Sequence, residues 1–447
     1  MAQTDRAATT AGPSDHKTAK AGGWYRWVVC ALIFASTSLL YVDRLTLGYL
    51  KGSLQLQYHW SETDYAGVVQ WFMFAYAIGF LAFGQIIDKL GARRGYVIAV
   101  LVWTAAHLAC AVVGFLPVSW VLVSFTVSYT VLGLGQGGNF PSALKVVAEW
   151  FPQRERALAI GIFNAGTNLG AILTPLIVPV VLIAYGWQWA IVATSGLSIL
   201  WLVFWLPFYS SPAQSKFTKK AELAYIESDP YVPVKQLPWI KVLLKKETWA
   251  YGLGKLLTDP VWFFYSFWLP SYFLTTFKDQ IGNVVGTALP IVIIFLVSDV
   301  GSVFGGWMSS AMIKAGLSVN VARKFSMLIC AALVLPMAVC TLLTKDMWAW
   351  VAIIGTAAAA HQAFSANLMA LTSDLMPKDA VGRCSGIGGT MGAIGGMIMA
   401  AGVGRALASS GGYTAIFIVA GVIYLVGLVV IHLISPKLTP AKFTPAP

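Results

Sequence analysis

The chain has 447 residues, of which 58% are hydrophobic and only 11% are charged. One soluble core could not hide this much apolar surface, so the composition excludes a soluble globular protein and predicts a protein that crosses a membrane many times. The formal net charge is +12, but the basic residues recur in short connections between apolar runs. Because they form no single patch, we expect the lipid bilayer and no nucleic acid as a partner.

The five cysteines lie in or beside apolar runs, with no CxxC pair and no histidine at a metal-binding spacing. We expect them to be packing residues without disulfides, and we expect neither a metal nor a cofactor. The sequence also lacks a paired nucleophile and base, an HExxH motif and a metal cluster. It therefore does not predict an enzyme.

Apolar runs occupy most of the chain after a polar start. Residues 1–23 lack the apolar core and cleavage site of a signal peptide, so we expect a disordered cytoplasmic tail there. A helix needs roughly 20 apolar residues to cross a bilayer of about 30 Å, and about twelve runs qualify. The expected spans are 25–49, 63–87, 95–115, 118–148, 157–184, 187–208, 248–276, 283–312, 323–344, 347–375, 381–408 and 413–434.

Alternate connections between these runs are rich in Lys and Arg, which indicates that they and both termini are cytoplasmic. The longest connection, 209–247, carries several charges and three prolines. It separates an expected six-helix bundle over 24–208 from a second one over 248–435, which a short cytoplasmic tail, 436–447, follows. The last part of the connection mixes apolar and basic residues, so we expect a helix on the inner membrane surface there.

The two halves of the chain resemble each other around one join in each. An acid, a proline and two glycines recur at a constant offset. The first set is Glu149, Pro152, Gly161 and Gly170, and the second is Asp374, Pro377, Gly386 and Gly395. Chance is the alternative in a chain with 42 glycines, but a repeated unit is the better interpretation. Two repeated bundles with a site between them are typical of transporters.

Asp43 and Arg44 stand side by side near the end of the first apolar run. Charges at membrane depth are costly, so a helix that keeps two usually uses them. Arg44 could cap the helix end and reach the headgroups, with Asp43 as its partner. Apolar residues resume at Leu45, Leu47 and Leu50, which favours an anion-binding site instead. In this interpretation Arg44 is the fixed positive charge and Asp43 is a neighbour that can take up a proton.

A glycine-rich motif lies between the second and third expected spans: Gly84, Asp88, Gly91, Arg93 and Arg94. The glycines permit close packing and a tight turn, and the charges can hold helix ends together in one state and release them in another. At this point the chain resembles the major facilitator superfamily, whose signature here is G-x-x-x-D-x-x-G-x-R-[RK]. The resemblance implies an all-α membrane fold of twelve transmembrane helices in two pseudo-symmetric six-helix bundles, with these five residues as a gate.

Further stretches narrow the resemblance, which covers essentially the whole chain after Gly22. Tyr41-x-Asp43-Arg44 and the run 133–141 look like the organic-anion symporter branch, and the runs 259–262 and 361–367 look like hexuronate transporters. The resemblance implies proton-coupled uptake of a sugar acid such as glucuronate or galacturonate. It also implies a monomer in a bacterial inner membrane.

The resemblance assigns roles residue by residue. Arg44 would bind the substrate carboxylate, and Asp43 would take part in proton coupling. The other expected substrate contacts are Tyr41, Tyr76, Gln136, Thr167, Asn168, Gln362 and Asn367. A polyhydroxylated anion needs one charged partner and several hydroxyl or amide partners. Each of these polar side chains could instead bridge two helices.

Two positions depart from the family pattern. Gln136 stands where members usually carry glutamate, and Tyr129 stands where they carry arginine. The two positions share a helix face, because seven residues make about two turns, and Gln cannot titrate. Either Asp43 carries the coupling alone, or the carrier works without a proton gradient, or the substrate is less acidic. An aldonate, an aldarate or an aromatic acid is an alternative substrate, and a sensor without transport is an alternative function.

Other polar residues within the spans are less informative. Lys255 and Asp259 lie four residues apart, so they could form an ion pair that lines the site or one that is purely structural. His107, Asp299 and His361 are isolated in the sequence.

Overall fold

The structure is a computed structural model that describes residues 23–228, 238–409 and 412–443. Most of the expected tail 1–23 lies outside these residues, as do parts of the connection 209–247 and of the tail 436–447. Helices are the only regular secondary structure in the described ranges. The predicted all-helical fold of two bundles is confirmed.

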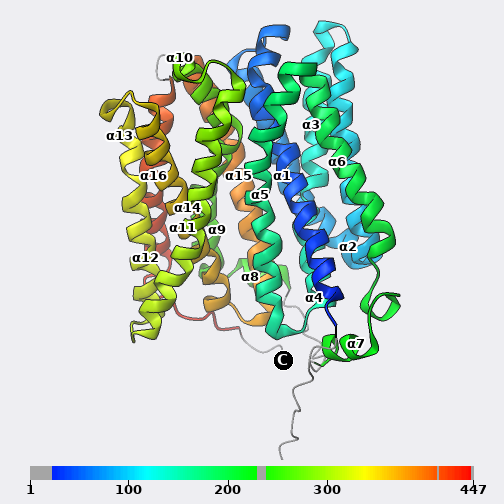
Figure 1. Ribbon diagram of the computed structural model, residues 1–447. Coiled ribbons are helices and arrows are strands. Elements are labelled where there is room, and N and C mark those ends of the chain that lie inside the picture. The colour runs from blue at the N-terminus through cyan, green and yellow to red at the C-terminus, as the bar shows by residue number, and fades with distance from the viewer. Residues whose placement is uncertain (1–22, 229–237, 410–411, 444–447) are drawn as a thin grey trace, which may run out of the picture.

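The first half of the chain contains the helices drawn from blue to green in Figure 1. They are α1 (Tyr25–Tyr58), α2 (Glu62–Val112), α3 (Val118–Gln136), α4 (Asn139–Trp150), α5 (Gln153–Tyr185) and α6 (Trp187–Phe208), with a short turn, η1 (Val113–Phe115). The connection that follows holds η2 (Pro212–Gln214), α7 (Lys220–Ile226) and α8 (Trp239–Leu243).

The second half begins with α9 and ends with α16. Its helices are α9 (Lys246–Thr276), α10 (Lys278–Ile281), α11 (Ala288–Lys314), α12 (Val319–Val334), α13 (Pro336–Leu343), α14 (Met347–Leu375), α15 (Lys378–Ala408) and α16 (Gly412–Ile434), with the turn η3 (Val284–Thr287). Ten helical segments of the described chain are long and apolar enough to cross a membrane. α9 and α14 have a similar length, 31 and 29 residues.

The expected end of the first span at residue 49 is wrong, because α1 continues to Tyr58. Lys51 does not end the helix, since its ammonium group lies 2.8 Å from the carboxylate of Glu62 and is almost fully buried. Leu54 and Tyr58 are also buried against the bundle. A paired charge and further apolar contacts therefore extend this helix by more than two turns.

Glycine or proline marks three breaks in the helices, two of which divide an expected span. Gly91 has a φ of 78° and separates the two membrane-spanning parts of α2, a conformation that L side chains rarely adopt. The expected span 118–148 is divided into α3 and α4 near Gly137, which packs against the backbone of Gly79. The expected span 323–344 is divided into α12 and α13 at Pro336, which cannot supply a helical N–H.

The second glycine of each repeated set has the same packing role in both halves. Gly170 brings α5 onto α1, where a Cβ would collide with the carbonyl oxygen of Ser38. Gly395 brings α15 onto α9, where a Cβ would collide with the carbonyl oxygen of Leu256. Small residues of this kind let helix backbones approach closely within a membrane.

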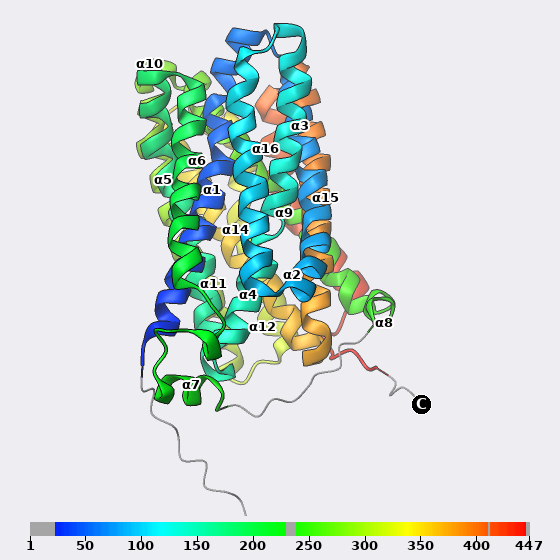
Figure 2. The same ribbon diagram turned by 90° about the vertical axis from the view of Figure 1, so that its right-hand side faces the viewer.

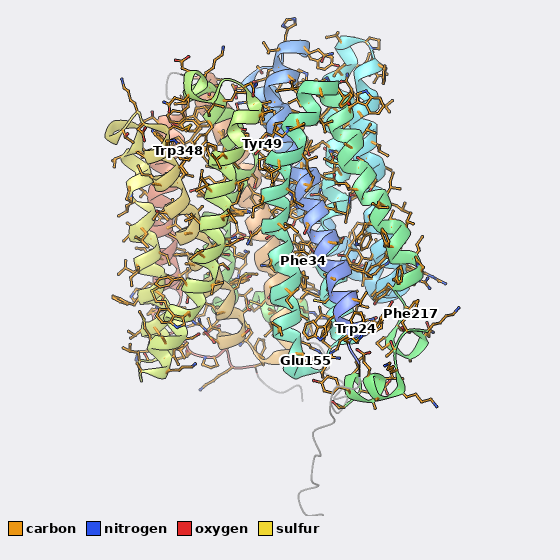
Figure 3. All side chains as sticks on the ribbon, viewed as in Figure 1. Trp24, Phe34, Tyr49, Glu155, Phe217 and Trp348 are labelled. Atoms are coloured by element: carbon orange, nitrogen blue, oxygen red, sulfur yellow. The ribbon has the colours of Figure 1, made fainter. Side chains whose placement is uncertain are left out.

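The two halves lie side by side, and their chain ends share one face. α1 begins and α16 ends at the lower end of the bundle in Figure 1, which we call the terminal face, and α7 and α8 lie there too. In Figure 3, Glu155 lies near the terminal face, and Tyr49 and Trp348 lie toward the opposite face. α2 and α15 run along each other across the boundary between the halves (Figure 2).

Contacts toward the opposite face join the halves. The hydroxyl of Tyr65 donates to the carbonyl oxygen of Phe267 at 2.7 Å. Gly48 of α1 faces the same stretch of α9, where a Cβ would lie 3.2 Å from that oxygen. Gly404 of α15 packs on Ala66 of α2. These contacts close the boundary on the side of the bundle away from the chain ends.

The connection between the halves is attached to the first half. Arg26 is buried in α1, with its guanidinium 2.8 Å from Glu155 of α5 and 3.2 Å from Glu222 of α7. Tyr225 of α7 also donates to Glu155 at 2.6 Å. The expected surface helix is present as α8, and the side chain of Ile240 on it is exposed.

Candidate functional site

Arg44 lies on α1 between Phe34 and Tyr49 in the sequence, and Figure 3 labels these two residues. It is 1% exposed. Its Nε donates to Oε1 of Gln136 at 3.0 Å, but Nη2 is buried without a hydrogen-bond partner. An unbonded guanidinium nitrogen in a buried site is costly. Arg44 therefore keeps a free donor and a full positive charge for a ligand.

Three aromatic rings surround the guanidinium. The ring centres of Tyr76, Tyr41 and Phe72 lie 4.4, 5.1 and 5.4 Å from its central carbon. Aromatic faces stabilise a cation while leaving its N–H groups free to bind an anion. The predicted residues Tyr41 and Tyr76 thus lie at Arg44, and Phe72 joins them.

The two positions that depart from the family pattern also contact Arg44. Gln136 accepts from Nε, and its own amide group donates to the carbonyl oxygen of Leu40 at 3.2 Å. Tyr129 donates to the main-chain carbonyl oxygen of Arg44 at 3.0 Å. Both replacements are neutral and hydrogen-bonded, so they orient Arg44 without neutralising it.

Asp43 points away from Arg44, and the expected pairing of these two residues is wrong. Successive residues of a helix point about 100° apart. The side chain of Asp43 lies inside the first half, where Oδ2 accepts from Ser198 of α6 at 3.0 Å. Its Oδ1 lies 3.2 Å from Nδ1 of His107 on α2. Asp43 is 0% exposed and His107 is 2% exposed.

The second half contributes an ion pair and two stacked rings. Nζ of Lys255 lies 2.6 Å from Oδ2 of Asp259, one turn further along α9. Trp262, another turn along, interacts with Tyr41 of the first half and stacks on His361 with the ring centres 5.2 Å apart. Lys255 and Asp259 also interact electrostatically with Tyr41. Tyr41 therefore connects Arg44 to the charged part of α9.

Polar contacts between the halves also meet at Asn168 of α5. Its Oδ1 lies 3.5 Å from the amide nitrogen of Gln362 on α14, and it accepts from Thr167 at 3.3 Å. Asn168 also interacts with Asp299 of α11. Three predicted substrate contacts are thus adjacent to one another, and they include a contact between the two halves.

Asn367 contacts neither the residues around Arg44 nor those around Asn168. Its amide donates to the carbonyl oxygens of Gly305 and Ala363 at 3.0 and 2.9 Å. Its Oδ1 accepts from Arg323 at 3.4 Å, and that arginine is paired with Asp374 at 2.9 Å. These bonds hold α11, α12 and α14 together within the second half, so the structure gives Asn367 a bridging position.

The predicted gate lies near the terminal face of the first half. Gly91 forms the turn that the motif predicts, and Gly84 has no atom within 4 Å of where its Cβ would lie. Arg93 donates to the carbonyl oxygen of Leu206 at 2.5 Å, and Arg94 is exposed. The side chain of Asp88 lies outside the described part of the structure.

Glu149 lies in the last turn of α4. Tyr209, just after α6, donates to Glu149 at 2.9 Å. Burial and the neighbouring carboxylate raise the pKa of Tyr209 well above its ordinary value. The hydroxyl therefore stays protonated at neutral pH and remains a donor to Glu149.

Sequence reasoning missed His107, Phe72 and Trp262. Phe72 precedes Tyr76 by one helical turn, so the spacing alone places both on one face. Nothing in the sequence links His107 to Asp43, because they lie on different helices. No group of three or more His, Cys, Asp or Glu that could hold a metal occurs in the described ranges.

A comparison of the chain with models of protein families shows which family it belongs to. The model of the Major Facilitator Superfamily matches residues 33–400 and 311–447. The chain belongs to the major facilitator superfamily. It is therefore a multi-pass membrane transporter, and the resemblance predicted from the gate motif is confirmed.

Curated relatives in this superfamily carry names of sugar-acid transporters. The chain is 28% identical over 413 residues to the hexuronate transporter of Escherichia coli K12, covering 91% of this chain and 93% of that one. It is 30% identical over 288 residues to the galacturonate transporter of Dickeya chrysanthemi, covering 63% and 81%. It is 28% identical over 422 residues to the D-galactonate transporter of E. coli O6:H1, covering 91% and 94%.

Solved structures of major facilitator proteins share the fold. The inward open xylose transporter XylE from E. coli has a TM-score of 0.70 at 13% identity, covering 92% of this chain and 97% of that one. A bacterial homologue of the human lysosomal transporter Spinster, inward-facing and occupied, has a TM-score of 0.69 at 15% identity, covering 93% and 98%. At this identity the likeness supports the fold alone.

Proposed function

We propose that the protein imports a sugar-acid anion, such as glucuronate or galacturonate, by proton symport with alternating access. The observation that carries the proposal is Arg44, a fully buried cation with one unbonded nitrogen among three aromatic rings. Such a group stabilises one carboxylate strongly, because a charge-assisted hydrogen bond gains strength where water is excluded.

The surroundings of Arg44 suit a polyhydroxylated anion. Tyr41 and Tyr76 bring phenol groups to the guanidinium, and Asn168 and Gln362 bring amide groups to the boundary between the halves. Hydroxyl and amide groups can each donate and accept, as sugar hydroxyls require. The names of the relatives, which include hexuronate, galacturonate and galactonate transporters, support the same class of substrate.

Alternating access fits contacts that are concentrated on one side of the site. Tyr65, Gly48 and Gly404 join the halves between Arg44 and the opposite face. Exposed basic residues lie at the terminal face, among them Arg93, Arg94 and Lys314, which favours a cytoplasmic location for that face. The proposed location is a bacterial inner membrane with both termini inside and the described state open to the cytoplasm. The proposed unit is a monomer.

The test is uptake of labelled glucuronate into proteoliposomes that contain the full chain. With an inward proton gradient, we expect accumulation above equilibrium. Without the gradient, we expect equilibration only. Competition by unlabelled galacturonate, galactonate, galactarate and benzoate then ranks the substrate class. If none of these acids is taken up or competes, the proposed substrate class is wrong.

An uncoupled carrier of the same anions is the second candidate, because a neutral glutamine occupies position 136 and hydrogen-bonds Arg44. Glutamine cannot release a proton, so this position cannot couple transport to a gradient. Uptake that equilibrates equally fast with and without the gradient would establish the uncoupled carrier.

A further inference from the structure

The buried acid of the first half has a partner that the proposed function does not yet use. His107 lies on the second part of α2, between Asp43 of α1 and Ser195 of α6. All three side chains are buried inside the first half. Histidine is the side chain whose charge ordinarily changes near neutral pH. His107 therefore lies beside Asp43, and Asp43 is the residue that precedes Arg44 of the proposed anion site.

Nδ1 of His107 lies between a hydroxyl and a carboxylate. It is 3.2 Å from the hydroxyl of Ser195 and 3.2 Å from Oδ1 of Asp43. Oδ1 of Asp43 is buried and accepts no hydrogen bond. The imidazolium form of His107 would place a positive charge beside this carboxylate oxygen, and the attraction between the two charges stabilises the added proton in a buried site.

The net charge of the buried residues Arg44, Asp43 and His107 suggests why a proton would bind to His107. Arg44 is positive and Asp43 is negative, so the buried set is neutral when His107 is neutral. Other titratable groups that interact with this set are Tyr129, Tyr41 and Tyr76, which surround Arg44, and Cys110 of α2. All four are uncharged in their ordinary state at neutral pH. The groups of α6 that face Asp43 and His107 are serine hydroxyls.

A substrate carboxylate on Arg44 would leave this set with one excess negative charge. An uncompensated charge in a buried site is costly, and one proton on His107 would remove it. We propose that His107 is the proton carrier of the transport cycle and takes up one proton when the anion binds Arg44. This inference rests on the proposed sugar-acid function, and it assigns the coupling to a residue outside the anion site itself.

Two opposite substitutions test the inference in the full-length protein. His107→Gln imitates the neutral state, so glucuronate binding should become weaker and independent of pH. His107→Lys imitates the protonated state, so binding should stay tight and also become independent of pH. Wild-type affinity should fall as the pH rises, by up to about tenfold per pH unit. The anion itself stays charged over this range.

Transport separates a coupling role from a merely structural one. Both variants should lose gradient-driven accumulation of glucuronate. Both should retain exchange of labelled for unlabelled glucuronate without a gradient, at concentrations that saturate binding. His432→Gln is the matched control, since His432 lies at the terminal face beside Lys324. It should behave as the wild type.

Two results would contradict the inference. One is a His107→Gln variant that accumulates glucuronate as the wild type does, and the other is pH-dependent binding that survives in both variants, which would assign the proton to Asp43. Because one variant is neutral and the other is positive at position 107, a variant that fails to fold still leaves the other to decide. A wild type that neither binds nor transports any sugar acid would instead overturn the proposed function, and the inference with it.

Discussion

Each half of the protein has, on its first helix, an acid with a basic partner, but the partners differ. In the first half, Asp43 of α1 meets His107, which can be neutral. In the second half, Asp259 of α9 meets Lys255 at 2.6 Å, and lysine gives up its charge much less readily. On the proposed role of His107, the first half changes its net charge during transport, whereas the second half holds a fixed ion pair.

The same contrast applies to the donors that face the boundary between the halves. Nη2 of Arg44 has no partner, while Nζ of Lys255 is bound to its own helix neighbour. On the proposed function, the first half binds the anion and the proton. The second half closes over them with a site whose charges already compensate each other.

The largest expected effect is the loss of the fixed pair. Asp259→Asn leaves Lys255 as an unpaired buried charge, which should cost about 3 kcal/mol of folding stability. Asp279→Asn, at an exposed acid, is the control and should cost much less. Thermal unfolding of purified protein in detergent measures both variants. Equal losses of stability in the two variants would show that Asp259 does not compensate a buried lysine.

Glycine packing should affect both halves alike. Gly170→Val and Gly395→Val each place side-chain atoms against a neighbouring backbone carbonyl, so each should lose about 2 kcal/mol of stability. Gly161→Val on α5 and Gly402→Val on α15 are matched controls, because no atom lies within 4 Å of their Cβ positions. If the two control variants lose as much folding stability as Gly170→Val and Gly395→Val, close packing at these glycines is not the cause.

Gln136→Glu should reintroduce an acid at Arg44. A carboxylate 3.0 Å from Nε would compete with the substrate anion, so glucuronate affinity should fall about tenfold at alkaline pH. At acidic pH the added group is protonated and the affinity should recover. Binding measured from acidic to alkaline pH checks this, with Gln85→Glu, on an exposed residue near the terminal face, as the control. If Gln136→Glu leaves glucuronate affinity unchanged at alkaline pH, Gln136 does not lie in the anion site.

The smallest expected effect is that of Tyr129→Phe. This change removes one hydrogen bond, of 3.0 Å, to the main chain of Arg44, and should cost about 1 kcal/mol of stability. Glucuronate affinity should change less than threefold, because the guanidinium keeps its contacts with Gln136 and the aromatic rings. A large loss of affinity would mean that Tyr129 contacts the substrate directly.

Much of the fold follows from sequence, because a bilayer demands long apolar helices and Gly91 demands a turn. The sequence also brings Tyr41, Arg44 and Tyr76 together correctly. It does not predict the direction of Asp43, whose adjacency to Arg44 in the chain separates their side chains on a helix. Nor does it identify His107, since partners on distant helices are set by packing.

One other expectation failed, and the prediction for Asn367 stays untested, for related physical reasons. The helix that begins at Tyr25 does not end near Lys51, because Glu62 from the next helix neutralises that lysine. Asn367 resembles a substrate contact in type, but carbonyl groups and Arg323 already occupy its hydrogen-bonding atoms. In both cases a polar side chain is used by a neighbour that the local sequence does not reveal.

Direct binding of labelled glucuronate to the wild type and to Arg44→Gln tests the central claim, that Arg44 is the anion site. The account predicts saturable binding to the wild type and an affinity at least about thirtyfold weaker in Arg44→Gln. Lys278→Gln, on an exposed lysine, should bind as the wild type does. Equal affinities of the wild type and Arg44→Gln would contradict the account.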